Sequence, residues 1–208
     1  MFCPKISLVN ILVVSGLLLA QVATASDDKG QYGVRGAALV SCSIYEKERE
    51  ARSPVYRMVA SWMDGYITAR NQYESDTYDT ASFESTELLA ALVSEHCKKH
   101  PETLVFTVVN SLVTQFAKNR LRLPSKKIEI MIGDRKVLLY EEVVRRMLEK
   151  LSVGGFYDGK INSVYGPQAQ TAMQAFQKSI ELQPTGFPDQ LTLWRLFNEN
   201  QASGQSSN

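Results

Sequence analysis

The stretch from Gly154 to Phe197 constrains the fold of this chain most, because glycine, proline and potential capping residues divide it into short segments. Glycine adopts a positive φ without a steric clash and is therefore typical of turns. Pro167 suits the first turn of a helix, where its missing N–H costs nothing. Asp189 lies where its carboxylate would cap a further helix. The stretch predicts short helices joined by glycine-bearing loops.

Apolar residues in and before this stretch recur at the helical spacing i, i+3, i+4 and i+7. One stripe precedes the stretch and a second lies within it: Tyr140, Val144, Met147, Leu148 and Leu151, then Ala169, Ala172, Met173, Phe176 and Ile180. Three short helices that carry such stripes can bury one small core. We expect Phe176 and Trp194 in that core, because both lie on apolar stripes.

Several short motifs follow one another in this part of the chain. They are Phe156-Tyr157-Asp158-Gly159, Tyr165-Gly166-Pro167, Ala172-Met173, Phe176-Gln177 and Thr185-Gly186, followed by Asp189, Thr192 and Leu196. In this order they resemble the peptidoglycan-binding-like domain of bacterial cell-wall proteins, and the resemblance implies a three-helix fold that binds the cell wall. The chain departs from the family pattern at Asn162-Ser163, where Asp-Gly is usual, and at Ala169, where threonine is usual.

The two turns of this segment, residues 156–159 and 162–166, offer aromatic and short polar side chains to a sugar polymer. Aromatic faces pack on sugar C–H groups, and polar side chains fix the orientation of hydroxyl and amide groups. We therefore expect peptidoglycan contacts from Tyr157, Asp158 and Tyr165, with Gln168 and Gln177 as weaker candidates. The alternative is that both tyrosines only pack the loops, and the two interpretations stay open.

Residues 1–25 have the pattern of a signal peptide. Lys5 precedes a mostly apolar run, and Ala23-Thr24-Ala25 is the small-x-small pattern that signal peptidase needs, so we expect cleavage before Ser26. The alternative, an uncleaved membrane anchor, is disfavoured because the run is short for a hydrocarbon core of ~30 Å. The sequence thus predicts a periplasmic or secreted protein with no membrane association after cleavage.

The charge of the mature chain limits its partners. Lys5 is one of 23 basic residues, so 22 remain after cleavage, against 22 acidic residues. Nucleic-acid binding requires a basic surface. The neutral balance therefore argues against a nucleic-acid partner.

Cleavage also leaves Cys42 and Cys97 as the two cysteines of the mature chain. Both lie on apolar helical faces, and an even cysteine pair in an oxidising compartment usually forms a disulfide. The alternative is a metal site that combines reduced thiols with His96 and His100, which are four residues apart. We favour the disulfide, with no metal ion and no cofactor.

Four amphipathic helices are expected upstream, and together they would form a small bundle. The helical pattern starts at Ala38, Ser53-Pro54 begins the second helix, Ser85 or Thr86 caps the third, and Pro101 opens the fourth. Residues 72–85 have no period, and we interpret them as a surface loop whose aromatic side chains fold back on the helices. The alternative is a loop that touches a partner.

The chain is therefore expected to be mainly α. The expected parts are a signal peptide 1–25, a flexible lead 26–36, a disulfide-stapled four-helix bundle 37–120, a linker with a short β-hairpin 121–138, a three-helix peptidoglycan-binding-like domain 139–198 and a disordered tail 199–208. The hairpin follows from Ile128, Ile130 and Ile132, which alternate with less apolar neighbours before the turn at Gly133-Asp134.

The sequence contains no catalytic constellation that points to an enzyme: neither a phosphate-binding glycine loop nor an HExxH pattern occurs. We expect non-catalytic attachment to peptidoglycan through the C-terminal domain. The alternative is a periplasmic protein-interaction role with that domain as a tether. Trp62, Gly65 and Tyr66, with the cysteine pair, resemble small secreted helical proteins of proteobacteria, which include acid-stress chaperones and immunity proteins of type VI secretion.

Overall fold

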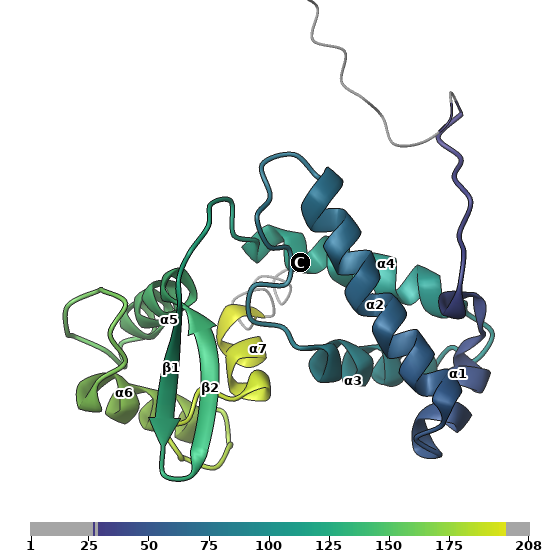
Figure 1. Cartoon of the computed structure of the whole chain (residues 1–208). Coiled ribbons are helices and arrows are strands. Elements are labelled where there is room, and N and C mark those ends of the chain that lie inside the picture. The colour runs from purple at the N-terminus through teal and green to yellow at the C-terminus, as the bar shows by residue number, and fades with distance from the viewer. Residues whose placement is uncertain (1–26, 28, 199–208) are drawn as a thin grey trace, which may run out of the picture. The chain divides into compact units, whose positions relative to one another are not determined.

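The computed structural model describes residues 27 and 29–198, so the expected signal peptide and the expected tail lie outside the described residues. Residues from Val34 onward form one compact unit. In the preceding segment, Asp27 Oδ1 accepts hydrogen bonds from the backbone N–H groups of Lys29 and Gln31. The described residues contain seven α-helices and one two-stranded antiparallel sheet (Figure 1), which confirms the mainly α fold class. None of these described helices has both the length and the apolar character needed to cross a bilayer.

The N-terminal half of the compact unit is helical. Its elements are the 3₁₀ turn η1 (Ala37–Leu39), α1 (Cys42–Glu50), α2 (Pro54–Tyr73), α3 (Thr86–Cys97), α4 (Val105–Phe116) and the 3₁₀ turn η2 (Ala117–Asn119). Ser53 caps α2 through a hydrogen bond from the Tyr56 N–H, and Ser85, not Thr86, caps α3 through the Leu88 N–H. Serine side chains satisfy the first free amides of a helix. The predicted starts of α2 and α3 are therefore confirmed.

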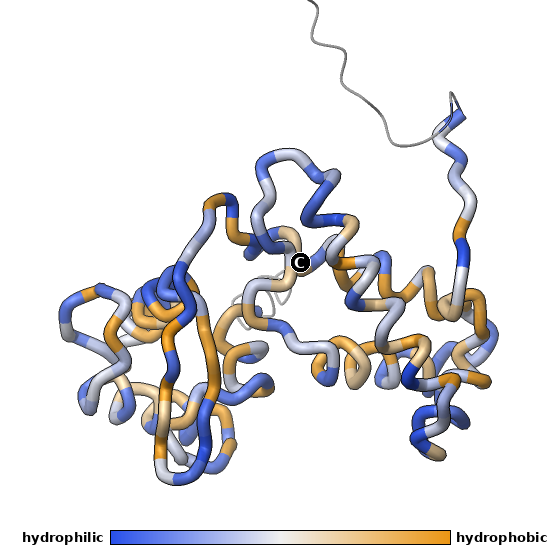
Figure 2. The backbone as a smooth tube through the Cα atoms, in the orientation of Figure 1, coloured by the Kyte–Doolittle hydropathy of each residue, from blue (hydrophilic) through white to orange (hydrophobic). Residues whose placement is uncertain are grey.

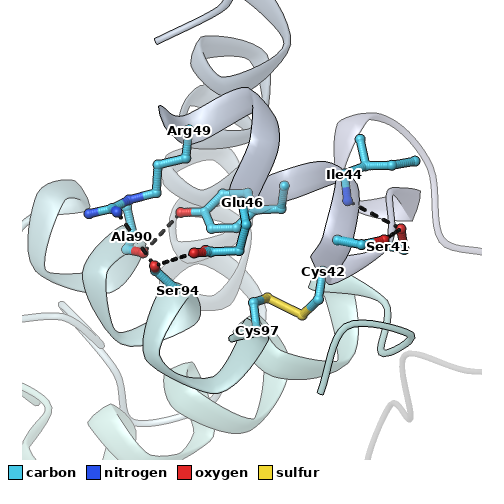
Figure 3. Close-up of a disulfide and its surroundings, with 10 residues drawn as sticks. Ser41, Cys42, Ile44, Glu46, Arg49, Ala90, Ser94 and Cys97 are labelled. Atoms are coloured by element: carbon cyan, nitrogen blue, oxygen red, sulfur yellow. Dashed lines mark hydrogen bonds between the residues drawn. A yellow bond between two sulfur atoms is a disulfide. The ribbon is translucent and has the colours of Figure 1, made fainter. Parts of the chain in front are cut away.

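The helices of this half share one hydrophobic core. Its buried members are Ala38, Cys42, Tyr45, Val59, Met63, Leu89, Val93, Cys97, Val105, Val108, Val109, Val113 and Phe116. Figure 2 shows hydrophobic stretches along α3 and α4, the helices that supply most of these residues. The disulfide between Cys42 and Cys97 joins the start of α1 to the end of α3 (Figure 3), as predicted.

Two helix starts in this half differ from the predictions. The fourth helix begins at Val105 and not at Pro101, and the helical pattern expected from Ala38 onward is interrupted before α1. The reason is long-range pairing: the Val105 N–H donates to the Val40 carbonyl, and the Cys42 N–H donates to the Thr103 carbonyl. Backbone groups that pair across the fold in this way are not available for helical hydrogen bonds.

The C-terminal half begins with the predicted hairpin. Strands β1 (Lys127–Ile132) and β2 (Arg135–Tyr140) pair antiparallel with Lys127 opposite Tyr140 and Ile132 opposite Arg135. Gly133 has φ 58° in the tight turn between them, a conformation that favours glycine. The helices α5 (Glu141–Val153), α6 (Pro167–Ser179) and α7 (Gln190–Asn198) follow. Pro167 starts α6 as predicted, and the Asp189 carboxylate accepts the Thr192 N–H at 2.9 Å at the start of α7.

A second hydrophobic core lies in this half. Most of its members come from the hairpin and the three helices: Ile130, Leu139, Tyr140, Val143, Val144, Met147, Leu148, Leu151, Ala169, Ala172, Met173, Phe176, Leu193, Leu196 and Phe197. Tyr157 joins them from the loop between α5 and α6. The hairpin thus packs on the C-terminal helices, where a two-stranded sheet gains the support that it lacks alone. Phe176 is part of this core, as expected.

The segment between α2 and α3 agrees with its interpretation as a surface loop over residues 72–79, but residues 80–84 are largely buried and join the two cores. Thr80, Ser82, Phe83 and Glu84 are buried. The Phe83 ring stacks on Phe197 of α7 with 4.8 Å between the centroids, and the Ser85 N–H donates to Gln190 Oε1. Of the expected loop, Tyr73 and Tyr78 remain exposed.

Trp194 also differs from its prediction. Although it lies on α7, its half-buried ring packs at the edge of the N-terminal core, 5.8 Å from the Phe116 ring centroid. These contacts connect the two halves of the compact unit. The expected domain boundaries at residues 120 and 138 stay a prediction.

Candidate functional site

The candidate site is the loop between α5 and α6, residues 154–166, together with the start of α6. Gly155 has φ 76°, which allows the chain to turn sharply after α5. The Tyr157 ring is buried, with 8% of its surface exposed, and its hydroxyl donates to the Lys160 carbonyl at 3.1 Å. Tyr157 therefore closes the turn from the inside, in accord with its alternative interpretation as a loop-packing residue.

Glycine is needed at position 159 because two side chains lie close to its Cα, and not because of a positive φ. A Cβ atom at this position would lie 2.5 Å from the Tyr157 hydroxyl oxygen and 2.5 Å from Gln168 Oε1. Real Cβ contacts are not that short, so any larger residue would displace one of these two side chains. Gly159 thus lets the turn pack against the first turn of α6.

Asp158 and Gln168 form the polar surface of this turn. The Gln168 Nε2 donates to Asp158 Oδ1 at 2.8 Å, and both side chains are exposed. Asp158 comes from the loop and Gln168 from the first turn of α6, so the hydrogen bond ties the loop to the helix. The pair leaves a second carboxylate oxygen and the amide oxygen of Gln168 available as hydrogen-bond acceptors.

Tyr165 connects this loop to the next one. Its hydroxyl donates to the Gly186 carbonyl at 2.5 Å, and burial raises the pKa of the Tyr165 hydroxyl above its ordinary value. The Asn162 Oδ1 accepts the Val164 N–H at 2.9 Å, a local turn that asparagine favours. The Tyr165 side chain is half-buried.

Gln177 lies beneath the site and not on its surface. None of its surface is exposed, and its Nε2 donates to the Phe187 carbonyl and to Thr192 Oγ1. Its Oε1 accepts the Gly186 N–H at 2.8 Å. All of these partners belong to the chain itself, so in this structure Gln177 holds the 183–189 loop in place.

The structure thus sorts the predicted contact residues by position. It brings Tyr157, Asp158 and Gln168 together at the N-terminal end of α6, and it places Tyr165 between the two loops. Gly159, expected only as a turn residue, leaves the space that the Tyr157 hydroxyl and the Gln168 amide occupy. In the sequence, the Asp158-Gly159 pair was the signal that could have indicated this role of Gly159.

A second concavity on the same half was not foreseen. It has a volume of about 220 Å³ and lies between α5, α6 and α7: Lys150, Val153, Gly154, Phe156, Phe176, Ser179, Ile180 and Leu196 line it. Its walls are mostly apolar, with the Lys150 ammonium as the charged group. The Phe156 and Phe176 rings meet edge to face at its base, with centroids 5.7 Å apart.

The possible metal ligands near Cys97 do not form a cluster. Within the residues that the structure describes, no three His, Cys, Asp or Glu side chains are placed to hold a metal ion. The His96 and His100 rings lie tilted against each other with centroids 4.5 Å apart, and both residues are exposed. Cys42 and Cys97 are joined to each other, so neither offers a thiolate.

Comparison with known proteins gives one positive result. No curated protein and no solved structure matches the chain. A family model does match, over about a quarter of the chain that includes α5, the candidate loop, α6 and most of α7. Residues 141–196 match the family described as "Putative peptidoglycan binding domain", which confirms the resemblance of the C-terminal part.

Proposed function

We propose that this protein is exported to the periplasm and binds peptidoglycan without catalysing its cleavage. The observation that carries the proposal is the family match of residues 141–196, which supports a cell-wall binding role. The exposed Asp158–Gln168 pair at the start of α6 is consistent with it. In this proposal the helical N-terminal half is the part of the protein that is attached to the wall.

The proposed contacts follow from the geometry of the loop. Asp158 and Gln168 offer acceptors to the hydroxyl and amide groups of the polymer, and the half-buried Tyr165 is the proposed aromatic contact with sugar C–H groups. Tyr157 and Gln177 act from below, because each holds one of the two loops through buried hydrogen bonds. A preformed loop of this kind reduces the ordering that binding requires.

The first prediction tests this site directly. The double variant Asp158→Ala/Gln168→Ala should weaken binding of the purified protein to sacculi by about tenfold, since two hydrogen-bonding groups are lost. Both side chains are exposed, so the fold should be retained. Sedimentation with purified sacculi at increasing protein concentration measures the affinity.

A matched control is available at the opposite end of α6. Gln183→Ala removes an exposed amide from the same half of the protein and should leave sacculus binding unchanged. If the double variant binds as tightly as the wild type, the contacts lie elsewhere, and the apolar concavity beside Phe156 becomes the next candidate. If the wild-type protein does not sediment at all, cell-wall binding itself is refuted, and the departures at Asn162-Ser163 and Ala169 are the sequence changes to examine.

The second prediction concerns export. The Ala23-Thr24-Ala25 pattern predicts cleavage before Ser26, so N-terminal sequencing of protein from the periplasm should begin at Ser26 or within one or two residues of it. A substitution of Ala25 by a bulky residue should cause the precursor to accumulate, because the cleavage site requires small side chains. Periplasmic protein that still begins at Met1 would contradict the proposal.

A second candidate function is a protein-interaction role for the N-terminal half, with the C-terminal part as a tether. It is favoured by a shallow groove between η1 and α2 that Ala37, Pro54, Arg57, Met58, Ser61 and Trp62 line, and by the high exposure of Met58. Exposed apolar side chains that gather on one surface are typical of partner sites. Both candidates predict sedimentation with sacculi, so they differ in whether the N-terminal half also captures a protein partner.

A further inference from the structure

Three arginines surround one cavity at the junction of α1 and α2. Arg49 lies in the last turn of α1, Arg52 lies in the short connection, and Arg57 lies in the first turns of α2. With Glu50 and Tyr56 they line a concavity of about 600 Å³. Since three arginines and one glutamate line it, the lining carries an excess of positive charge.

None of the three guanidinium groups forms an ion pair within the described part of the chain. Arg57 donates to the Arg52 carbonyl at 2.9 Å, and Arg49 makes a long hydrogen bond of 3.4 Å to Ser94 Oγ. Each guanidinium has five N–H donors, so most of the donors around the cavity are free.

Arg49 provides the most direct indication of a missing partner. Its Nε is buried and has no hydrogen-bond partner among the described residues, and Oε1 of the neighbouring Glu46 is likewise buried without one. Figure 3 shows the guanidinium beside Ser94, whose hydroxyl donates to Glu46 Oε2 at 2.9 Å, so the nearest carboxylate reaches Arg49 only through this serine. A buried charged donor without an acceptor is unfavourable unless a ligand supplies one.

The backbone at Arg52 adds an independent observation. Arg52 has φ 48° at the end of α1, a position where helices usually place glycine. The left-handed conformation disfavours residues with a Cβ. Arg52 is exposed and lines the cavity, and no hydrogen bond or ion pair joins its side chain to the rest of the described chain.

We propose that the cavity formed by Arg49, Arg52, Tyr56 and Arg57 is a binding site for an oxyanion, the phosphate or carboxylate group of a ligand. Guanidinium groups bind such anions through paired N–H donors, and several of them around one cavity select a group with more than one negative charge. The site lies in the N-terminal half and does not depend on the proposed binding of peptidoglycan by the C-terminal half.

The test is a titration of the purified protein with inorganic phosphate at constant ionic strength, followed by NMR of the arginine side-chain N–H signals. We expect saturable shifts at Arg49 and Arg52, and about tenfold weaker binding in Arg52→Gln, which removes one charge-assisted contact. Lys47→Gln is the matched control: it removes the same charge from an exposed position on α1 that does not line the cavity. Its phosphate affinity should stay within twofold of the wild type.

A parallel titration with succinate separates the two sources of the anion. Tighter binding of phosphate assigns the site to phosphate esters, and tighter binding of succinate assigns it to carboxylate ligands. Shifts that do not saturate, or equal weakening in Arg52→Gln and Lys47→Gln, would overturn the proposal, because either result means general charge attraction only. Thermal unfolding of each variant verifies that the fold is retained.

Discussion

Replacement of both Cys42 and Cys97 by alanine should lower the free energy of unfolding by about 2–4 kcal/mol. The disulfide closes a loop with a sequence separation of 55 residues, and its loss allows the unfolded chain more conformations. Both residues are buried, with 0% and 2% of their surface exposed, so the alanine variant also loses apolar contacts in the core of the N-terminal half. Urea denaturation followed by circular dichroism measures the change.

The control for this result is the reductant. Dithiothreitol should destabilise the wild-type protein toward the double variant and leave the variant itself unchanged. Mass spectrometry of unreduced protein should show the wild type two protons lighter than its reduced form. Two titratable thiols in protein isolated from the periplasm, with an unchanged denaturation midpoint in the double variant, would refute the stabilising role.

The substitution Glu84→Gln should stabilise the protein above pH 7 and have little effect near pH 4.5. The pKa of Glu84 is raised from its ordinary value of 4.5 to about 7, chiefly by burial; two backbone hydrogen bonds lower it, and the charge of the neighbouring Asp79 adds to the rise that this net value includes. Only 8% of Glu84 is exposed, in the segment where Phe83 stacks on Phe197. The folded protein therefore favours the neutral carboxyl group at the contact between the two cores.

The sign of the pH dependence follows from the raised pKa. A group that binds its proton more tightly in the folded state contributes stability that is complete below pH 4.5 and is lost as the pH rises through about 7. Glutamine has no charge to bury, so the gain of the variant over the wild type should grow to about 3 kcal/mol by pH 8. Urea denaturation at several pH values between 5 and 8 measures this difference.

Glu102→Gln is the matched control for Glu84. Glu102 is exposed, so the same chemical change there should give a difference from the wild type that does not vary over this pH range. A flat difference for Glu84→Gln as well would show that the carboxylate reaches water when it ionises. A gain restricted to high pH would confirm that its burial opposes ionisation.

Local chemistry in the sequence was sufficient to predict most of the helices and the hairpin. Ser53, Ser85 and Asp189 cap helices, because their side-chain oxygens accept hydrogen bonds from the free N–H groups of the first turn. Pro167 begins a helix, because it has no N–H group that would need a partner there. The alternation of apolar and less apolar residues before Gly133 predicted the hairpin, since successive side chains of a strand point to opposite faces. The ordered motifs from residue 156 onward sufficed for the resemblance that the family model confirms.

The candidate site was predicted only in part. The sequence indicated the correct turn, but not which side chains reach the surface of it: Asp158 and Gln168 do, whereas Gln177 is fully buried. Amide and aromatic side chains serve equally well as ligand contacts or as internal supports. Only the packing around each residue decides between these uses.

The tertiary structure alone decided how distant segments meet. Residues 101–104 do not extend α4, because neighbouring backbone groups pair with the segment before α1. Phe83 and Trp194, expected in a surface loop and in the C-terminal core, instead lie between the two halves of the protein, against Phe197 and Phe116. Capping and periodicity depend on residues within a few positions of one another and can therefore be recognised in the sequence, whereas these contacts join residues more than 55 positions apart and depend on the folded shape of both halves.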